Sequence, residues 1–347
     1  MINSDFVQKY GLTLSLILIA SYFGTQIKEK LHVDRKEEED HELIRKYILN
    51  DSPLYGYNKP KLWIHSIYEI NSRNWKSFQS RNTEELNQPY LNYTIKSIIN
   101  KCSDHFHICL IDDKSFNKLI PGYSKNISNM PDPLKTQYRE LAMLELIYLY
   151  GGIIVPNSFL CMKNLNELYQ KLHSLKKPYV FEQRNKYCNM KLKKKPDYVP
   201  NIEMIGSRKN CPIIYSIIRL LKMDLDKGHI TQENDFTGKT SNILMQFINT
   251  GDMAIVDGTT IGIKDTSNKA IDIEDLFSYN KEIHFSDDMY GINLPKEDIL
   301  KRSKFNWLAA LNEEDTMKAN INLVRYIKVS QVSDYLDNKK KVISTYF

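Results

Sequence analysis

The sequence predicts an α/β protein in which helices flank a mostly parallel sheet. Residues 61–65 and 107–111 are short, apolar segments rich in strand-forming side chains, and a helical pattern over 87–101 separates them. Parallel strands need a crossover of this kind, so the three segments predict a β–α–β unit. A second unit follows, in which a long helix over 133–150 leads through two glycines into a buried strand at 153–155.

The bulk composition fits a folded domain. Of the 347 residues, 42% are hydrophobic and 26% are charged, which is enough to build a core. The net charge of +6 comes from 48 basic and 42 acidic residues that are interspersed, so it indicates only a weak preference for phosphate groups or an anionic membrane. No nucleic-acid-binding module is visible, and we expect no nucleic-acid partner.

Five cysteines are present, and none has the C-x-x-C spacing of a zinc site. A Cys102–Cys109 disulfide is open as an alternative, but the pattern favours buried free thiols. A disulfide framework is therefore not indicated.

The first residues predict a membrane anchor. An apolar run over residues 6–27, with two polar interruptions near its start, is close to the about 20 residues that span a bilayer. We expect residues 1–27 to be an uncleaved signal-anchor, because no small-residue cleavage site precedes the charged stretch; a cleaved signal and a buried helix are the alternatives. Residues 28–58 are then a charged stalk, residues 59–315 the main domain and residues 316–347 a C-terminal extension.

The second unit ends in a polar loop. Asp132 is a helix-capping residue, Pro133 suits the first helical position, and Gly151 suits the left-handed position that ends a helix. Pro156 cannot donate a ladder hydrogen bond, so strand pairing should end there. Because ligands of open α/β sheets bind beyond the carboxyl ends of strands, we expect the loop 157–158 to contact a ligand.

Other polar side chains end the strands of the first unit. His65 closes the strand 61–65, and Asp112 and Asp113 follow the strand 107–111. Their position predicts that they too lie beside a ligand. Two alternatives stay open, a satisfied buried histidine for His65 and a turn with a following helix cap for Asp112 and Asp113.

The segment 140–159, with Tyr-Gly-Gly-Ile at its centre, resembles the core motif of glycosyltransferases that bind a metal through an Asp-x-Asp (DXD) sequence. The resemblance is to fungal initiating mannosyltransferases and capsular-polysaccharide enzymes, and it covers roughly residues 59–170. It implies a GT-A-like fold with a Rossmann-type central sheet and a hexosyltransferase-like activity. The partners it implies are a nucleotide-sugar donor and a glycan or glycoprotein acceptor.

The chain departs from that family where the metal site should be. Aligning Gly151 and Gly152 with the glycines of the family puts Pro156 and Ser158 at the two aspartates, with Asn157 between them. Proline has no ligand atom, and a hydroxyl is a poor substitute for the carboxylate oxygens that hard cations prefer. We therefore expect no metal ligand here and no Mn²⁺ or Mg²⁺ at this place.

The helix departs from the family as well. The same alignment puts Glu140 at the helix aspartate and Met143 at the helix arginine, so a phosphate-contacting cation is lost. Arg139 lies next to Glu140, about 100° around the helix, and is not expected to replace that arginine. An active enzyme would use other basic residues, such as those at 193–195 or Lys239, to offset the charge of a diphosphate.

Three functions follow from these observations. The first is a membrane-anchored glycosyltransferase without the usual metal, and the second is an inactive protein of the same fold that serves as a binding or structural module. An interaction protein of unrelated α/β fold is the third, and it requires that residues 133–159 are not helix and then strand. In an active enzyme we expect Glu140 and Asp287 to be catalytic carboxylates. The residues expected to bind the donor are His65, Asp112, Arg139, Asn157 and Ser158.

The orientation in the membrane has two opposing indications. Lys28, Lys30, Arg35 and Lys36 follow the apolar run, which by the positive-inside rule places the domain in the cytosol. The family resemblance implies instead a single-pass type II topology, with the domain on the lumenal side of a Golgi-type, ER-type or host membrane.

Overall fold

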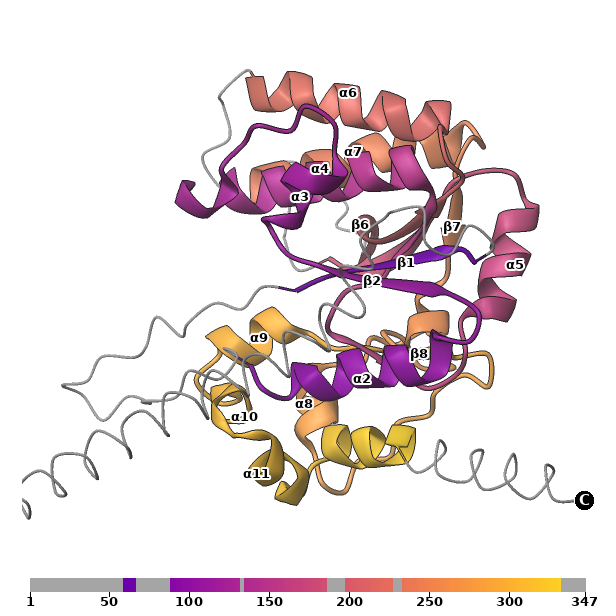
Figure 1. The fold of residues 1–347 in the computed structure, drawn as a ribbon. Coiled ribbons are helices and arrows are strands. Elements are labelled where there is room, and N and C mark those ends of the chain that lie inside the picture. Colours follow the sequence, from indigo (N-terminus) through magenta and orange to yellow (C-terminus); the bar gives the residue numbers. More distant parts are fainter. Residues whose placement is uncertain (1–58, 67–87, 132–133, 186–196, 227–232, 332–347) are drawn as a thin grey trace, which may run out of the picture. The chain divides into compact units, whose positions relative to one another are not determined.

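The computed structural model describes most of the chain after residue 58 (Figure 1). The described ranges are 59–66, 88–131, 134–185, 197–226 and 233–331. All of them belong to one compact unit, Gly56–Phe347. Within these ranges no helix is long and apolar enough to cross a membrane. The predicted anchor and stalk, 1–58, and the basic residues 193–195 lie outside the described residues.

The central sheet has six strands in the order β2-β1-β3-β6-β5-β7. Strand β1 pairs in parallel with β2 and β3, and β5 pairs in parallel with β7. Strand β6 runs antiparallel between β3 and β5, so the prediction of a mostly parallel sheet is confirmed. A separate antiparallel pair is formed by β4 and β8. The strands are β1 Lys61–His65, β2 His107–Ile111, β3 Gly152–Ile154, β4 Phe159–Cys161, β5 Tyr179–Arg184, β6 Tyr198–Ser207, β7 Ala254–Val256 and β8 Gly291–Asn293.

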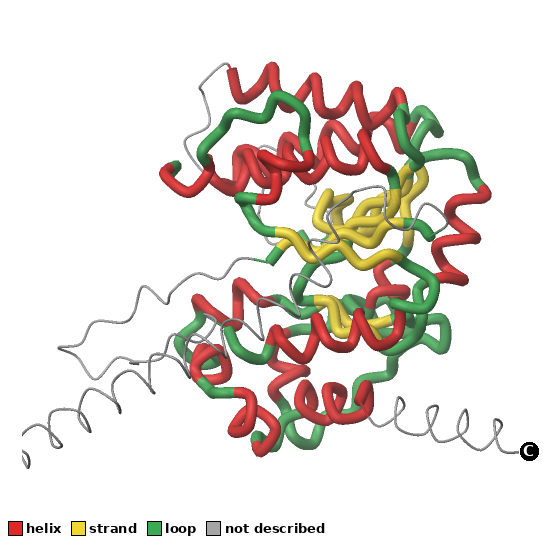
Figure 2. Tube along the Cα trace, in the orientation of Figure 1, coloured by secondary structure: helices red, strands yellow, loops and turns green. Residues whose placement is uncertain are grey.

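Helices cover both faces of the central sheet. Helices α3, α4, α6 and α7 lie on one side, and α2 lies with α8 to α11 on the other (Figures 1 and 2). The longer helices are α2 Leu91–Cys102, α4 Leu134–Tyr150, α5 Asn166–Ser174, α6 Pro212–Asp226 and α7 Glu233–Asn249. The shorter ones are α3 Ser115–Leu119, α8 Ile273–Phe277, α9 Lys296–Lys301, α10 Asn306–Ala310, α11 Glu313–Lys318 and the 3-10 turns η1 Ile127–Asn129 and η2 Gly258–Ile261. A last helix runs over 322–331.

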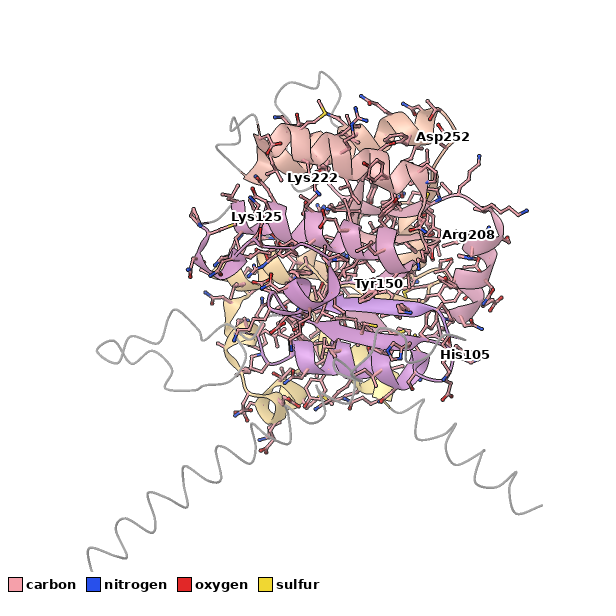
Figure 3. All side chains as sticks on the ribbon, turned by 45° about the horizontal axis from the view of Figure 1, so that its top comes forward. His105, Lys125, Tyr150, Arg208, Lys222 and Asp252 are labelled. Atoms are coloured by element: carbon pink, nitrogen blue, oxygen red, sulfur yellow. The ribbon has the colours of Figure 1, made fainter. Side chains whose placement is uncertain are left out.

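Two apolar clusters hold these layers together. The first joins the sheet to α4 and α6 and includes Trp63, Leu144 and Ile217, all almost fully buried. An ion pair between Lys222 of α6 and Glu145 of α4 closes its rim, where Figure 3 shows Lys222 between the two helices. The second cluster lies around β4 and β8 and includes residues 321–327, so packing continues beyond residue 315.

The two glycines after α4 allow the strand that follows them, β3, to lie close to β1. Gly151 has φ +70°, as predicted for the end of the helix, and its carbonyl accepts a hydrogen bond from the indole of Trp63 at 2.9 Å. Gly152 has φ +103°, and a Cβ there would lie 2.1 Å from the carbonyl oxygen of Lys61. Only glycine fits both the angle and the approach, so the pair fixes β3 against β1.

Candidate functional site

A cavity of about 410 Å³ lies at the carboxyl ends of the parallel strands. Its wall includes His65 at the end of β1, the segment 155–158 after β3, and Asn185 after β5. The volume falls within the roughly 300–1,000 Å³ of small-molecule sites. The predicted residues that line it are His65, Arg139, Glu140, Asn157 and Ser158. Residues from the strand ends and from helix α4 thus line one cavity.

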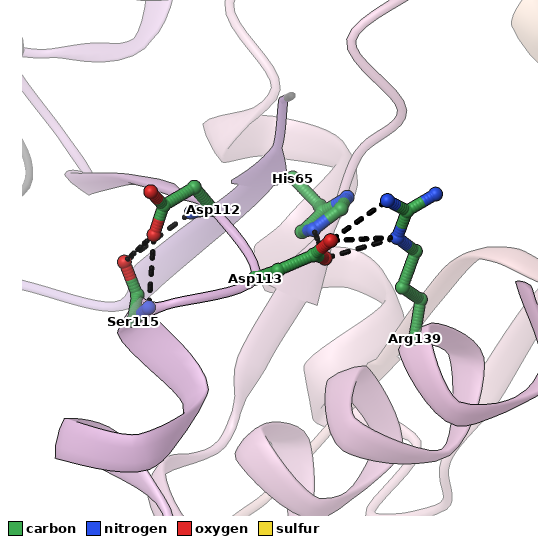
Figure 4. Close-up of polar contacts among 5 residues, drawn as sticks. All are labelled: His65, Asp112, Asp113, Ser115 and Arg139. Carbon is green, nitrogen blue, oxygen red and sulfur yellow. Dashed lines mark hydrogen bonds and ion pairs between the residues drawn. The ribbon is translucent and has the colours of Figure 1, made fainter. Parts of the chain in front are cut away.

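At one end of the cavity, Asp113 joins His65 to Arg139 (Figure 4). The Arg139 guanidinium donates from Nε to Asp113 Oδ1 at 2.9 Å and from its terminal nitrogen to Oδ2 at 2.7 Å. His65 Nε2 lies 3.0 Å from Asp113 Oδ1, and the imidazole stacks on Phe116 with a centroid distance of 5.4 Å. A two-pronged contact of this kind fixes the direction of the guanidinium as well as its position.

The charges of His65, Asp113 and Arg139 shift the pKa values of His65 and Asp113. Burial tends to raise the pKa of Asp113, but the hydrogen bonds and charges of His65 and Arg139 outweigh it and lower that pKa to about 2. Asp113 is therefore ionised at neutral pH, and His65 Nε2 carries the hydrogen of their bond. Burial lowers the pKa of His65, which Asp113 opposes, and the positive charges of Arg139 and Lys296 lower it further. His65 is thus neutral, with two cations near it.

The two neighbouring aspartates have different roles. Asp112 accepts hydrogen bonds from the backbone N–H of Ser115 at 2.8 Å and from its hydroxyl at 2.6 Å, at the start of α3. It does not line the cavity, so for Asp112 the turn-and-cap alternative is the one that the structure shows. Asp113 is instead the residue that bonds to two side chains of the cavity wall, His65 and Arg139.

Asp287 is exposed on a turn and is not among the residues that line the cavity. Its carbonyl oxygen accepts a hydrogen bond from Lys163 Nζ. The structure therefore does not bring Asp287 together with Glu140.

Helix α4 presents a longer face to the cavity than the sequence predicted. Thr136, Arg139, Glu140 and Met143 all line it. Arg139 and Met143 are four residues apart and share one side of the helix, so Arg139 lines the same cavity as the residue aligned with the lost arginine. Asp113 holds the Arg139 side chain at that side.

The loop after β3 is held from three directions. The Thr94 hydroxyl of α2 donates to the backbone carbonyl of Asn157. The Ser158 hydroxyl donates to the side-chain carbonyl of Asn293 at 3.2 Å. Lys296 Nζ donates to Oδ1 of Asn157 at 2.7 Å. Asn157 and Ser158 are 7% and 2% exposed, so the loop presents a small, fixed surface to the cavity.

Sequence reasoning missed one functional candidate, Lys296. It placed both Asp112 and Asp113 beside a ligand because they come after β2, but it could not tell which of the two joins the site. Lys296 had no local signal, because it lies in a charged segment 139 residues after its partner Asn157. Lys239, which the sequence offered as a compensating cation, does not line the cavity.

The loop does not suit a divalent cation. Pro156 has no ligand atom, the hydroxyl of Ser158 is hydrogen-bonded to Asn293, and the amide oxygen of Asn157 is bonded to an ammonium group. Ca²⁺ and Mg²⁺ sites in proteins are built mainly from carboxylate oxygens. Across the described ranges, no three His, Cys, Asp or Glu side chains are grouped so that they could hold a metal ion.

Comparison with known proteins gives weak similarities. No protein family and no curated protein matches the sequence. Among solved structures, PaToxG glycosyltransferase is 14% identical, with 56% of this chain and 71% of that chain covered and a TM-score of 0.34. Mouse xyloside xylosyltransferase 1 in its apo form is 11% identical, with 59% and 87% covered and a TM-score of 0.36.

A third similar structure is the galactosyltransferase LgtC in complex with donor and acceptor sugar analogues. It is 10% identical, with 75% of this chain and 100% of that chain covered and a TM-score of 0.35. Because these TM-scores are low, the functional argument rests on the cavity and its residues.

Proposed function

We propose that this chain is a glycosyltransferase-like protein that binds a nucleotide-sugar donor in the cavity and transfers the sugar to a hydroxyl of a glycan or glycoprotein. The observation that supports this most is the convergence of Arg139 and Lys296 on one cavity at the carboxyl ends of β1 and β3. A nucleotide sugar carries a diphosphate, and fixed cations in a partly dry cavity stabilise that charge strongly. The resemblance of segment 140–159 to the DXD glycosyltransferases supports the same substrate class.

The proposed transfer breaks one bond in the donor and forms one bond to the acceptor. The bond between the anomeric carbon and the diphosphate oxygen breaks, and its electron pair leaves with the nucleoside diphosphate. The acceptor hydroxyl oxygen forms the new bond to the anomeric carbon, and its proton passes to a base. Glu140 is the base we propose, because it is the carboxylate residue of α4 that lines the cavity beside Arg139.

We further propose that residues 6–27 anchor the protein in a membrane, on the strength of the apolar run. The side of the membrane on which the domain lies stays a prediction with two opposing indications. The proposed chemistry of the cavity depends neither on this anchor nor on the side of the membrane on which the domain lies.

The test is calorimetric titration of the full chain, purified in detergent, with a panel of UDP- and GDP-linked sugars in EDTA and again with Mn²⁺. We expect at least one donor to bind and to be consumed when an acceptor hydroxyl is present. Glu140→Gln should lower that turnover by about 10²–10⁴-fold while the donor still binds. Binding without turnover would favour the inactive binding module, and binding of no donor would overturn the proposal.

A further inference from the structure

A positively charged group lies beside the loop 156–158, where the family resemblance places the lost metal motif. Lys296 Nζ lies 2.7 Å from Oδ1 of Asn157, the residue between the two lost carboxylates. Both side chains line the cavity, and so does Arg139. The loop therefore contacts an ammonium group where the resembling enzymes would place a divalent cation.

The placement of Lys296 is built into the fold. Lys296 is the first residue of α9 and follows β8, which pairs with β4 directly after the loop. The backbone N–H of Leu294 donates to the carbonyl of Ser158 at 3.1 Å, and the backbone N–H of Lys296 donates to the carbonyl of Leu294 at 2.8 Å. These bonds set the distance between the loop and the start of α9, so the backbone of Lys296 is held within reach of the loop.

We infer that Lys296, together with Arg139, provides the positive charge that binds the diphosphate of the donor, so that donor binding needs no divalent metal. This inference rests on the proposed function and deepens it. An ammonium is a compact charge with three N–H donors, and its contact with Asn157 places that charge at the loop. The Arg139 guanidinium, held by Asp113, lines the same cavity. The same charges stabilise the nucleoside diphosphate as it leaves.

The experiment measures the binding of UDP and GDP to the full chain by calorimetry in EDTA, with and without a later addition of Mn²⁺. Lys296→Gln removes the charge, and Lys296→Arg keeps it. Lys301→Gln is the matched control, because Lys301 lies on the same helix, is exposed and does not line the cavity. Thermal unfolding of each variant shows that it is folded.

We expect one of the two nucleotides to bind in EDTA, with no more than a small change on adding Mn²⁺. Lys296→Gln should weaken this binding by about 10- to 100-fold, as for the loss of a hydrogen bond between charged groups. Lys296→Arg should lose less, and Lys301→Gln should bind as the unchanged chain does.

The other outcomes separate the two proposals. Binding that appears only with Mn²⁺, or binding in EDTA that Lys296→Gln does not weaken, would overturn the role of Lys296 and leave the proposed function standing. If neither UDP nor GDP nor any sugar linked to them binds in either condition, the proposed function fails and this inference fails with it. If the Lys296→Gln chain does not fold, the test rests on Lys296→Arg. Because the proposed role of Lys296 depends on its positive charge, Lys296→Arg should still bind the nucleotide in EDTA.

Discussion

Removing the negative charge of Asp113 should weaken the folded state measurably. Asp113 and Arg139 are 11% and 16% exposed at the side chain, and Asp113→Asn leaves the guanidinium without its carboxylate partner. Lowering the pKa of Asp113 from 3.8 to about 2 corresponds to about 2 kcal/mol. Solvent that enters the cavity screens part of this energy, while removing one partner of the buried Asp113–Arg139 pair adds a further cost. We expect a net loss of about 2 kcal/mol in the free energy of unfolding.

Urea titration of the full chain, followed by circular dichroism, measures this loss. Asp112→Asn is the matched control, because Asp112 only caps α3 through Ser115 and asparagine caps equally well. The control should change the free energy of unfolding by less than about 0.5 kcal/mol. If Asp113→Asn and Asp112→Asn lost equal amounts, the ion pair would not stabilise the fold and our reasoning about the site would be refuted.

The same pair predicts a pH dependence with a definite sign. The pKa of Asp113 is lower in the folded state than its ordinary value of 3.8, so its contribution is complete above that value. The contribution is lost as the pH falls from about 4 to about 2. The difference in stability between the unchanged chain and Asp113→Asn should therefore be constant from neutral pH to about 5 and shrink below about 4. A difference that stayed the same at pH 3 would contradict the assignment.

Two further predictions concern the packing around the site. Gly152→Ala should lower the free energy of unfolding by more than about 3 kcal/mol or prevent folding, because the added Cβ would lie 2.1 Å from the Lys61 carbonyl oxygen. Gly122→Ala is the control, because Gly122 has φ +73° but no atom lies within 4 Å of the added Cβ. In thermal unfolding this control should lose about 1 kcal/mol. The thiols of Cys102 and Cys161 lie 3.9 Å apart and both are fully buried, so they should resist alkylation by iodoacetamide in the folded protein and react once it is unfolded in urea. Mass spectrometry of digested protein would detect the modified cysteines, and rapid modification of both in the folded protein would refute the prediction.

The sequence alone predicted much of the local structure. The strands at 61–65 and 107–111 have the bounds expected from their composition, and the helix that ends at Gly151 has the expected left-handed terminus. These features depend on side-chain propensity and on interactions within a few residues, which periodicity and capping patterns record. The rule that ligands bind at the carboxyl ends of strands then led to the loop 157–158.

The tertiary structure alone decided which of the polar residues at this end of the sheet act together. The choice of Asp113 over Asp112 depends on where α4 carries Arg139, and the contact of Lys296 with Asn157 depends on how β8 pairs with β4. The partners in the second contact are 139 residues apart, so no local pattern records it. The sequence by itself determined the elements and the edge of the sheet at which the cavity lies. The charges that face the cavity are set by the packing of distant segments, because a side chain acquires its partners only when the layers come together.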